Sequence, residues 1–305
     1  MATEKTELQE RMKSDKSILI AEVSPPPSGD AAAVCETADR YAGRVHALGV
    51  SDNRDRVCMS ALAAASLVAG GGVEPILHVV TRDRNRIALI SQCLGAQALG
   101  IRNILCTTGT HQTLGQFRAA KNVFDVDSIQ LLQTYARLGE DCPIVGEARI
   151  NVEGPLCLGG TAAPFADPPE LHLMRLAKKV AAGAEFLITQ PVFDLARFDA
   201  WWKEVTQQGI HDRVAMIAGI RILTDAGEAK QYAKRRPLSM IPQSVLKRIA
   251  SNGDKAAQRA AGIEIAVETI GQLSALGGLR GFEICGNGDD DAAIQVIEKS
   301  GLGVD

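Results

Sequence analysis

The chain has 305 residues and a formal net charge of −3, with 33 basic and 36 acidic side chains. This near balance lacks the electrostatic signature of a protein that binds nucleic acid or an anionic membrane surface. The seven cysteines are odd in number and dispersed, which argues against a disulfide framework and against a zinc or iron–sulfur site made of thiolates.

The start of the chain is charged and has a helical pattern, unlike a signal peptide. No apolar run in the sequence approaches the length of a membrane span. We therefore expect a cytoplasmic protein with an N-terminal helical extension over residues 1–17 and a catalytic domain over residues 18–305.

Strand-like and helix-like patterns alternate along the rest of the chain. Apolar runs predict strands over Ile18–Val23, Val45–Val50, Pro75–Val80, Asn103–Thr107, Pro143–Asn151, Glu185–Gln190, Val214–Ile220 and Leu279–Cys285. Amphipathic patterns predict intervening helices over Ala31–Tyr41, Met59–Val68, Asn85–Leu99, Val126–Leu138, Pro169–Ala182, Asp194–Gln207, Thr224–Lys234, Lys255–Leu276 and Asp290–Lys299, with a short extra helix within Pro242–Ala250.

This alternation predicts an α/β protein that forms a single (β/α)8 TIM barrel. The alternative is an open doubly wound sheet, but no G-x-G-x-x-G motif follows the first strand. In a barrel, ligands bind at the C-terminal ends of the strands. The segment Asn103–Gly115 has the character of such an edge, because an apolar strand stops abruptly in Thr108, Gly109, Thr110 and His111.

The other predicted strands deliver further polar residues to the same edge. They are Glu22, Ser24, Ser51, Asp52, Asn53, His78, Thr81, Glu147, Arg149, Asn151, Thr189, Gln190, Glu283 and Asn287. The set lacks the histidine and carboxylate cluster of a catalytic metal site, and it shows no nucleophilic triad. A hydrogen-bonding pocket of this kind suits a cofactor that carries the chemistry itself, such as a flavin.

Glu22 stands inside an apolar strand, where a carboxylate is costly unless it is paired or functional. Burial favours its protonated form and predicts a general acid, whereas the structural alternative is an ion pair with Arg149 or another barrel arginine. Gln190 can donate and accept at once, as recognition of a heterocycle requires, or it could bridge neighbouring strands. His78 could be a satisfied core histidine or a ligand contact, and the helical pattern alone makes Lys179 a solvated charge.

Three charged segments have simpler explanations. Arg82–Arg86 and Arg235-Arg236 lack interleaved aromatic residues, so a role in nucleic-acid binding is not expected. Asp289–Asp291 could suggest a cation site, but carboxylates that cap a helix N-terminus account for the same pattern.

Three segments carry a family resemblance: Ala21–Pro26, Gly100–Gly109 and Gly183–Asp194. Together they resemble methylenetetrahydrofolate reductases over about residues 18 to 302. The resemblance is closest to the short branch of acetogens and other anaerobes that consists of the catalytic domain only. Arg82–Arg86 is typical of that branch.

The resemblance implies a barrel with a non-covalent flavin, FAD or FMN, that reduces 5,10-methylenetetrahydrofolate to 5-methyltetrahydrofolate. It assigns Glu22 to protonation of the folate nitrogen and Gln190 to contact with the pterin. It assigns cofactor binding to Ser51, His78, Thr108, Gly109, Thr110, His172 and Lys179, against the solvated interpretation of that lysine. No metal is implied.

The chain departs from the family pattern at three positions. Thr110 stands where many members have an aspartate, Thr108 where an arginine is common, and His172 where a phosphate-side helix carries an aspartate. Without a carboxylate beside the isoalloxazine, reduced anionic flavin is not repelled by a like charge. We therefore expect a higher flavin reduction potential than in family members that have the aspartate.

The expected partners are a folate substrate, NADH or an electron-transfer partner subunit as the electron donor, and further copies of the chain in an oligomer. Neither nucleic acid nor a membrane is expected. Two other functions fit the same pocket. One is a flavin-free, pterin-binding methyltransferase barrel that acts with a corrinoid protein, and the other is a non-catalytic folate-binding subunit of a larger complex.

Overall fold

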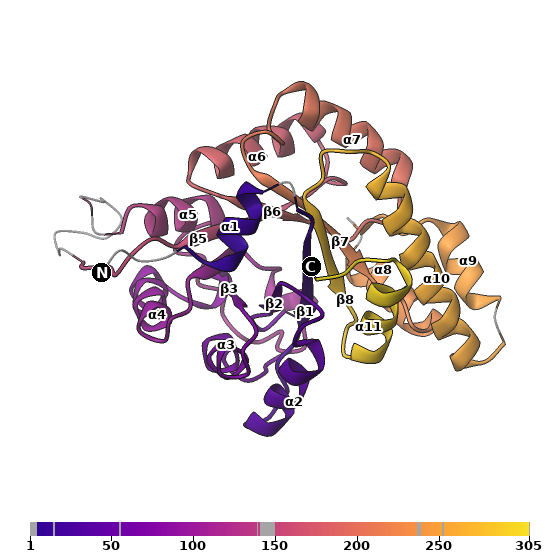
Figure 1. Ribbon diagram of the computed structural model, residues 1–305, viewed down its shortest axis with the longest axis horizontal. Helices are drawn as coiled ribbons and strands as arrows, with labels where there is room; N and C mark the ends of the chain where they lie inside the picture. The colour runs from indigo at the N-terminus through magenta and orange to yellow at the C-terminus, as the bar shows by residue number, and fades with distance from the viewer. Residues whose placement is uncertain are drawn as a thin grey trace.

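The computed structural model describes residues 5–14, 16–54, 56–138, 140, 150–236, 239–251 and 253–304. Within these residues, eight parallel strands close into a barrel in the order of the sequence (Figure 1). They are β1 (Ile18–Val23), β2 (Ala47–Val50), β3 (Pro75–Val80), β4 (Asn103–Thr107), β5 (Cys157–Ala162), β6 (Phe186–Thr189), β7 (Ala215–Arg221) and β8 (Gly281–Cys285). The pairing of β8 with β1 confirms the predicted (β/α)8 barrel and rules out the open sheet.

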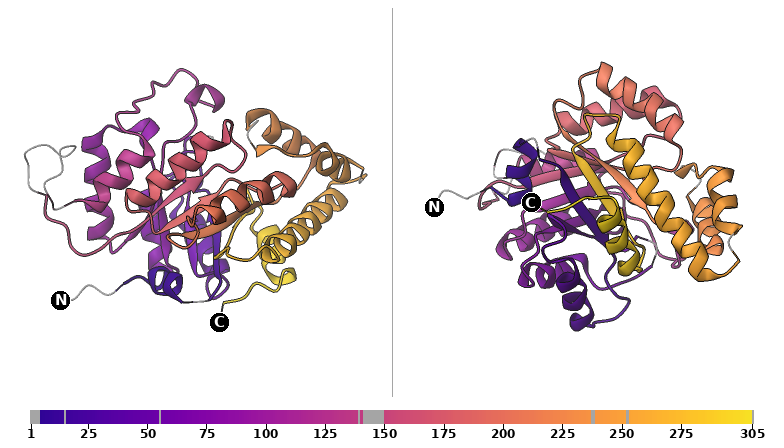
Figure 2. Two further views of the ribbon diagram at one scale, coloured as in Figure 1. Left: turned by 90° about the horizontal axis from the view of Figure 1, so that it is seen from above. Right: turned by 45° about the vertical axis from the view of Figure 1, so that its right-hand side comes forward.

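Helices surround the barrel on its outer side (Figures 1 and 2). They are α2 (Ala31–Tyr41), α3 (Ala61–Gly70), α4 (Arg86–Ala98), α5 (Ser128–Ala136), α6 (Pro169–Ala181), α7 (Leu195–Gln207), α8 (Ala226–Arg235), α9 (Gln243–Ala250), α10 (Lys255–Ser274) and α11 (Asp290–Lys299). Among the described residues, none of the helices is both long and apolar enough to span a bilayer.

Aspartate or asparagine side chains fix where most of these helices begin. Each accepts a hydrogen bond from a backbone N–H in the first turn, which satisfies a group that the helix itself leaves unpaired. These residues are Asp30, Asn85, Asp127, Asp194, Asp225, Asp254 and Asp289. Asp289 therefore caps α11, as the helix-start interpretation of the aspartate run predicts.

The helix α1 (Glu7–Lys13) lies across the N-terminal end of the barrel, within the segment predicted as a helical extension (Figure 2). Its Leu8 is fully buried against the apolar side chains of the barrel interior. The Leu8 backbone N–H donates to Glu74 at 2.9 Å, and Gln9 donates to Glu185 at 3.0 Å, so α1 contacts segments that precede two different strands. This end of the barrel is thereby covered, and a cavity lies at the opposite end.

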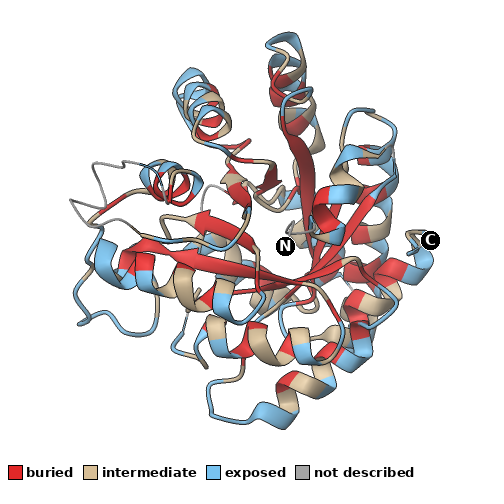
Figure 3. Ribbon diagram, turned by 60° about the vertical axis from the view of Figure 1, so that its left-hand side comes forward, coloured by how far each residue is buried: buried red, intermediate tan, exposed pale blue. Residues whose placement is uncertain are grey.

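Side chains that alternate along the strands fill the barrel. The strands are buried along their length, as Figure 3 shows. The interior cluster consists of Ile18, Ile20, Ala47, Ile76, Leu105, Cys157, Phe186, Ile188, Ala215 and Ile217, together with Leu8 of α1. Nearer the C-terminal ends, the next inward positions on β1, β3 and β8 carry Glu22, His78 and Glu283, so the filling changes there from apolar to polar.

The fifth barrel strand does not lie at Pro143–Asn151, where the sequence predicts it. The fifth strand is β5, while residues 143–149 lie outside the described residues and Ile150 and Asn151 belong to no strand. The error has a physical origin in Gly159 and Gly160, because glycine usually weakens a strand. A Cβ on Gly159 would lie 2.2 Å from the Phe186 ring, so this strand needs a glycine to make room for a large neighbour on β6.

Candidate functional site

A cavity of about 620 Å³ opens at the C-terminal ends of the strands. This volume falls within the range of roughly 300–1,000 Å³ that small-molecule sites usually have. The structure brings all nine residues singled out in the sequence to its wall: Glu22, Ser51, His78, Thr108, Gly109, Thr110, His172, Lys179 and Gln190. Of the other expected edge residues, Asp52, Thr189 and Glu283 also line it, and Ser24 and Asn287 line a smaller cavity beside it. Asn53, Thr81, His111 and Asn151 line neither cavity, and Glu147 and Arg149 lie outside the described residues.

Glu22 is buried in the wall, with 2% of its side chain exposed, and it forms an ion pair with Arg54. Arg54 follows β2 and is partly exposed, so the expected pairing with an arginine exists, while Arg149, the residue named for it in the sequence, lies outside the described residues. The other Glu22 oxygen accepts a hydrogen bond from the Cys285 thiol at 3.7 Å. Burial raises the pKa of that thiol to about 11, which keeps its proton available for this bond. Glu22 is thus held from two sides.

His78 and Glu283 form the polar floor of the cavity. Burial lowers the pKa of His78 to about 4, so its imidazole is neutral. Burial, and then the nearby Glu22 carboxylate, raise the pKa of Glu283 to about 8. His78 Nε2 and Glu283 Oε1 are both buried without a hydrogen-bond partner. Such atoms are uncommon in folded proteins and often mark functional sites.

Gln190 directly follows β6 and is fixed by its backbone. Its N–H donates to the Ala162 carbonyl at 2.9 Å, and its carbonyl accepts from the Thr189 hydroxyl at 2.9 Å. The same hydroxyl accepts from the Gly219 N–H at 3.0 Å, which ties β6 to β7. The side-chain Oε1 of Gln190 is buried without a partner, so a hydrogen-bond donor on a ligand would satisfy it.

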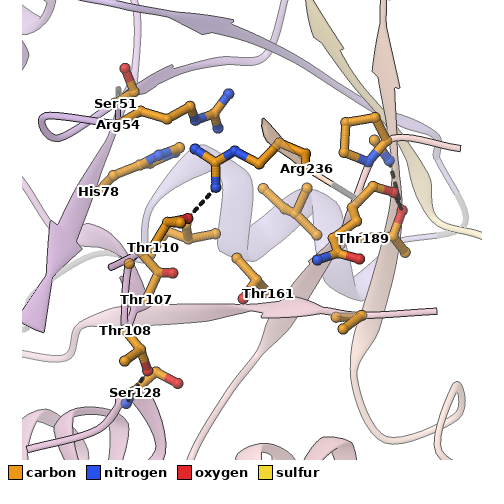
Figure 4. Close-up of a pocket in the computed structure, with 18 of the residues that line it drawn as sticks. Ser51, Arg54, His78, Thr107, Thr108, Thr110, Ser128, Thr161, Thr189 and Arg236 are labelled. Atoms are coloured by element: carbon orange, nitrogen blue, oxygen red, sulfur yellow. Dashed lines mark hydrogen bonds between the residues drawn. The ribbon is translucent and has the colours of Figure 1, made fainter. Parts of the chain in front are cut away.

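The segment after β4 has a conformation that requires glycine. Gly109 has a φ of +82°, and a Cβ there would lie 2.5 Å from Val80 Cγ1. The adjacent Thr110 carbonyl accepts from Arg82 at 3.0 Å. The Thr110 hydroxyl bonds the Arg236 guanidinium, which reaches across from the segment after α8 (Figure 4). An arginine therefore contacts the position at which the family pattern has an aspartate.

The structure contradicts the interpretation of Lys179 as a solvated charge, which was based on the helical pattern alone. It is 8% exposed and donates to the Thr161 carbonyl on β5. Burial, and then the positive charge of Arg175, lower its pKa to about 8. A buried cation that lines a cavity beside a second cation is suited to binding an anionic group such as a phosphate.

The sequence interpretation missed the arginines. Arg82 and Arg236 belong to the two clusters that were set aside for lack of aromatic residues, and both line the cavity. Their positions, just after β3 and just after α8, were the available signal. Arg54 also lies just after a strand, but nothing in its local sequence indicates the pairing with Glu22.

A second cavity of about 270 Å³ shares part of this wall. Its lining includes five arginines: Arg54, Arg56, Arg221, Arg235 and Arg236. Glu228 is the one carboxylate among its described lining residues, and it pairs with Arg221 at 2.7 Å. This part of the mouth is therefore strongly cationic. The described residues contain no group of three or more histidines, cysteines or carboxylates that could hold a metal ion.

Comparison with known proteins adds a family match. The family model for methylenetetrahydrofolate reductase matches residues 7–301. A Caenorhabditis elegans protein described as a probable methylenetetrahydrofolate reductase (NADPH) is 27% identical over 199 residues. That match covers 64% of this chain and 27% of the nematode protein, so the matched part spans only about a quarter of that relative's length.

Solved structures share the fold at low sequence identity. An uncharacterized protein from Clostridium thermocellum that binds two copies of 5-methyl-5,6,7,8-tetrahydrofolic acid superposes with a TM-score of 0.66 and 14% identity, covering 95% of this chain and 97% of that chain. A riboflavin lyase with modified FMN and riboflavin superposes with a TM-score of 0.56 and 9% identity, covering 93% and 90%. At these identities the likeness extends to the barrel architecture alone.

Proposed function

The chain belongs to the methylenetetrahydrofolate reductase family, and from this premise we propose that it uses a flavin to reduce 5,10-methylenetetrahydrofolate to 5-methyltetrahydrofolate. One observation carries the proposal most directly. The buried carboxylate of Glu22 and the unpartnered amide oxygen of Gln190 belong to one cavity of small-molecule size. A proton-handling group and a heterocycle-binding group are the two functions that this reaction demands of the protein.

The folate is bound through complementary hydrogen bonds and charges. A pterin carries an amino group and ring N–H donors, which match the free acceptor on Gln190. The glutamate part of a folate carries carboxylates, which the arginine-rich second cavity suits. The substrate would thus place its ring at the strand ends and its charged tail beside α8.

Glu22 serves the proton step in this proposal. Reduction of the one-carbon bridge requires the five-membered ring to open, and opening requires a proton on one of its nitrogens. Glu22 is the carboxylate through which that proton reaches the folate. Arg54 and Cys285 hold the Glu22 side chain in place, so it is already ordered before the substrate binds.

The residues of the cavity fit a flavin. Lys179 and Arg175 supply buried and half-buried cations for its phosphate, with His172 and Thr108 on the same side. His78 is neutral with an unpartnered ring nitrogen, and Ser51 offers a hydroxyl 3.0 Å from that of Ser24, so both can hydrogen-bond a polar ring edge. When bound, the flavin would supply the hydride. FAD and FMN both suit these groups, and NADH or a partner subunit would supply the electrons.

The test begins with the purified protein. We expect flavin absorbance, a released cofactor with the mass of FAD or FMN, and formation of 5-methyltetrahydrofolate after anaerobic reduction. Glu22→Gln should lose turnover while folate binding persists, and Glu74→Gln, at the covered end of the barrel, should leave both unchanged. Protein without flavin that passes a methyl group to a corrinoid protein would instead identify a methyltransferase, and folate binding without any turnover would identify a binding subunit.

A further inference from the structure

A second carboxyl group lies beneath Glu22. On the paired strands β1 and β8, Glu283 is level with Ile20 and Cys285 is level with Glu22. Glu283 is therefore two residues deeper in the barrel than Glu22, on the neighbouring strand. It lines the main cavity, is 7% exposed, and leaves Oε1 without a partner.

The residue opposite keeps the space around Glu283 open. Gly49 on β2 is level with Glu22, and a Cβ there would lie 3.3 Å from Glu283 Oε1 and 3.0 Å from His78 Nε2. The two unpartnered atoms thus border the same point on β2. Any larger residue at position 49 would fill the space between them, so glycine preserves a polar floor that the cavity reaches.

The charges around Glu283 favour its neutral form. The charged groups that act on Glu283 are Glu22 on β1 and Arg54 after β2. The titratable groups around them include Asp52 after β2, His78 on β3, Arg221 on β7 and Cys285 on β8. Burial and the like charge of Glu22 outweigh the attraction of Arg54, so Glu283 is protonated at neutral pH. Glu22 itself is the anionic partner of Arg54 in its ion pair.

We propose that Glu283 holds the proton for ring opening and passes it by way of Glu22 to the folate nitrogen. This inference rests on the proposed reductase function. The O–H bond of Glu283 breaks as one forms on Glu22, and Glu22 then protonates the nitrogen. The bond between that nitrogen and the bridging carbon breaks, with its electron pair left on the nitrogen. After the product leaves, Glu283 regains a proton from solvent through the open cavity. Glu283 acts through Glu22 and is a positioning and proton-storing residue.

The decisive variant is Glu283→Gln, which keeps the shape of the side chain but cannot deliver the proton. In single turnovers of the reduced holoenzyme, we expect the wild-type rate of 5-methyltetrahydrofolate formation to fall as the pH rises through about 8, where Glu283 loses its proton. Glu283→Gln should lower the rate at neutral pH by about a hundredfold, the lower end of what general acid catalysis contributes. It should also abolish the alkaline fall, with the KM for folate unchanged.

Two controls separate this role from a structural one. Glu74 is another carboxyl whose pKa is raised, first of all by burial, but it lies at the far end of the barrel, so Glu74→Gln should retain the wild-type profile. Glu283→Asp retains an acid and should keep an alkaline fall even if its rate is reduced. It also provides the test if the glutamine variant fails to fold.

The possible results distinguish a failure of the role of Glu283 from a failure of the reductase function. A Glu283→Gln enzyme that reduces the folate at the wild-type rate, or that is slow but still loses rate above pH 8, would overturn the role of Glu283 and leave the reductase function standing. A wild-type protein that binds flavin and folate but produces no 5-methyltetrahydrofolate would overturn the reductase function, and this inference with it.

Discussion

Gly159→Ala should destabilise the barrel, although it adds only one methyl group. Gly159 lies on β5 level with Leu105 of β4 and Phe186 of β6. The added Cβ would lie 2.2 Å from two carbons of the Phe186 ring, well inside van der Waals contact. Phe186 is fully buried in the interior cluster, so its ring cannot turn into solvent to relieve the clash.

The expected magnitude follows from two opposing effects. Overpacking of a filled core costs about 1–3 kcal/mol. Alanine restricts the unfolded chain more than glycine does and recovers about 0.4–1 kcal/mol where the native backbone conformation suits it. Because the clash involves a ring that cannot leave the interior, we expect the first effect to win and the net loss to be about 1–2 kcal/mol.

Denaturant unfolding measures this loss, and the chain offers a matched control. Gly271 lies on the exposed side of α10, and a Cβ added there would have no heavy atom within 4 Å, so Gly271→Ala should raise the free energy of unfolding by up to about 1 kcal/mol. In a Phe186→Leu background the ring carbons are gone, and Gly159→Ala should then cost less than it does in the wild type. An equal cost in both backgrounds would refute the assignment of the loss to the Phe186 ring.

Two further predictions concern the cation and the threonine at the cavity wall. Because burial lowers the pKa of Lys179 from 10.5 to about 8, the unfolded chain binds more protons than the folded chain between these values, and wild-type stability should gain from this group as the pH rises through that window. Lys179→Met should lose this gain and weaken flavin binding, whereas Lys178→Met, on the exposed face of α6, should do neither; identical pH dependence of unfolding in Lys179→Met would contradict the assignment. Thr110→Asp should lower the potential of bound flavin relative to Thr110→Val in a spectroelectrochemical titration, since both remove the hydroxyl next to Arg236 but only one adds a negative charge. A potential that the aspartate leaves unchanged or raises would sink that argument.

The barrel could be predicted from the sequence because the same alternation of an apolar strand and an amphipathic helix is repeated along the chain. Strands such as Ile18–Val23, Pro75–Val80 and Asn103–Thr107 have the same bounds in the structure as in the sequence prediction. The strand prediction fails at β5, where two adjacent glycines, Gly159 and Gly160, stand in place of larger apolar residues. Those glycines are determined by Phe186 and Leu187 on the next strand, and a pattern read along one segment carries no information about the volume of its neighbour.

The candidate site, too, could be predicted from the sequence only in part. Residues whose type is unusual for their place in the sequence, such as Glu22 within an apolar strand, could be found from the sequence, and the cavity contains them. Lys179 could not be found from its pattern, because the helical spacing does not indicate that its ammonium group reaches the Thr161 carbonyl inside a cavity wall. The family resemblance found it by position alone.

The role proposed for Glu22 depends on pairing across strands. Barrel closure brings β8 beside β1 and sets Glu283 below Glu22, while the segment after β2 supplies Arg54 above. In the proposed relay Glu283 holds the proton, because burial and then the Glu22 carboxylate raise its pKa. The proposed delivery of a proton therefore depends on closure of the barrel, which pairs two strands that are more than 250 residues apart in the chain.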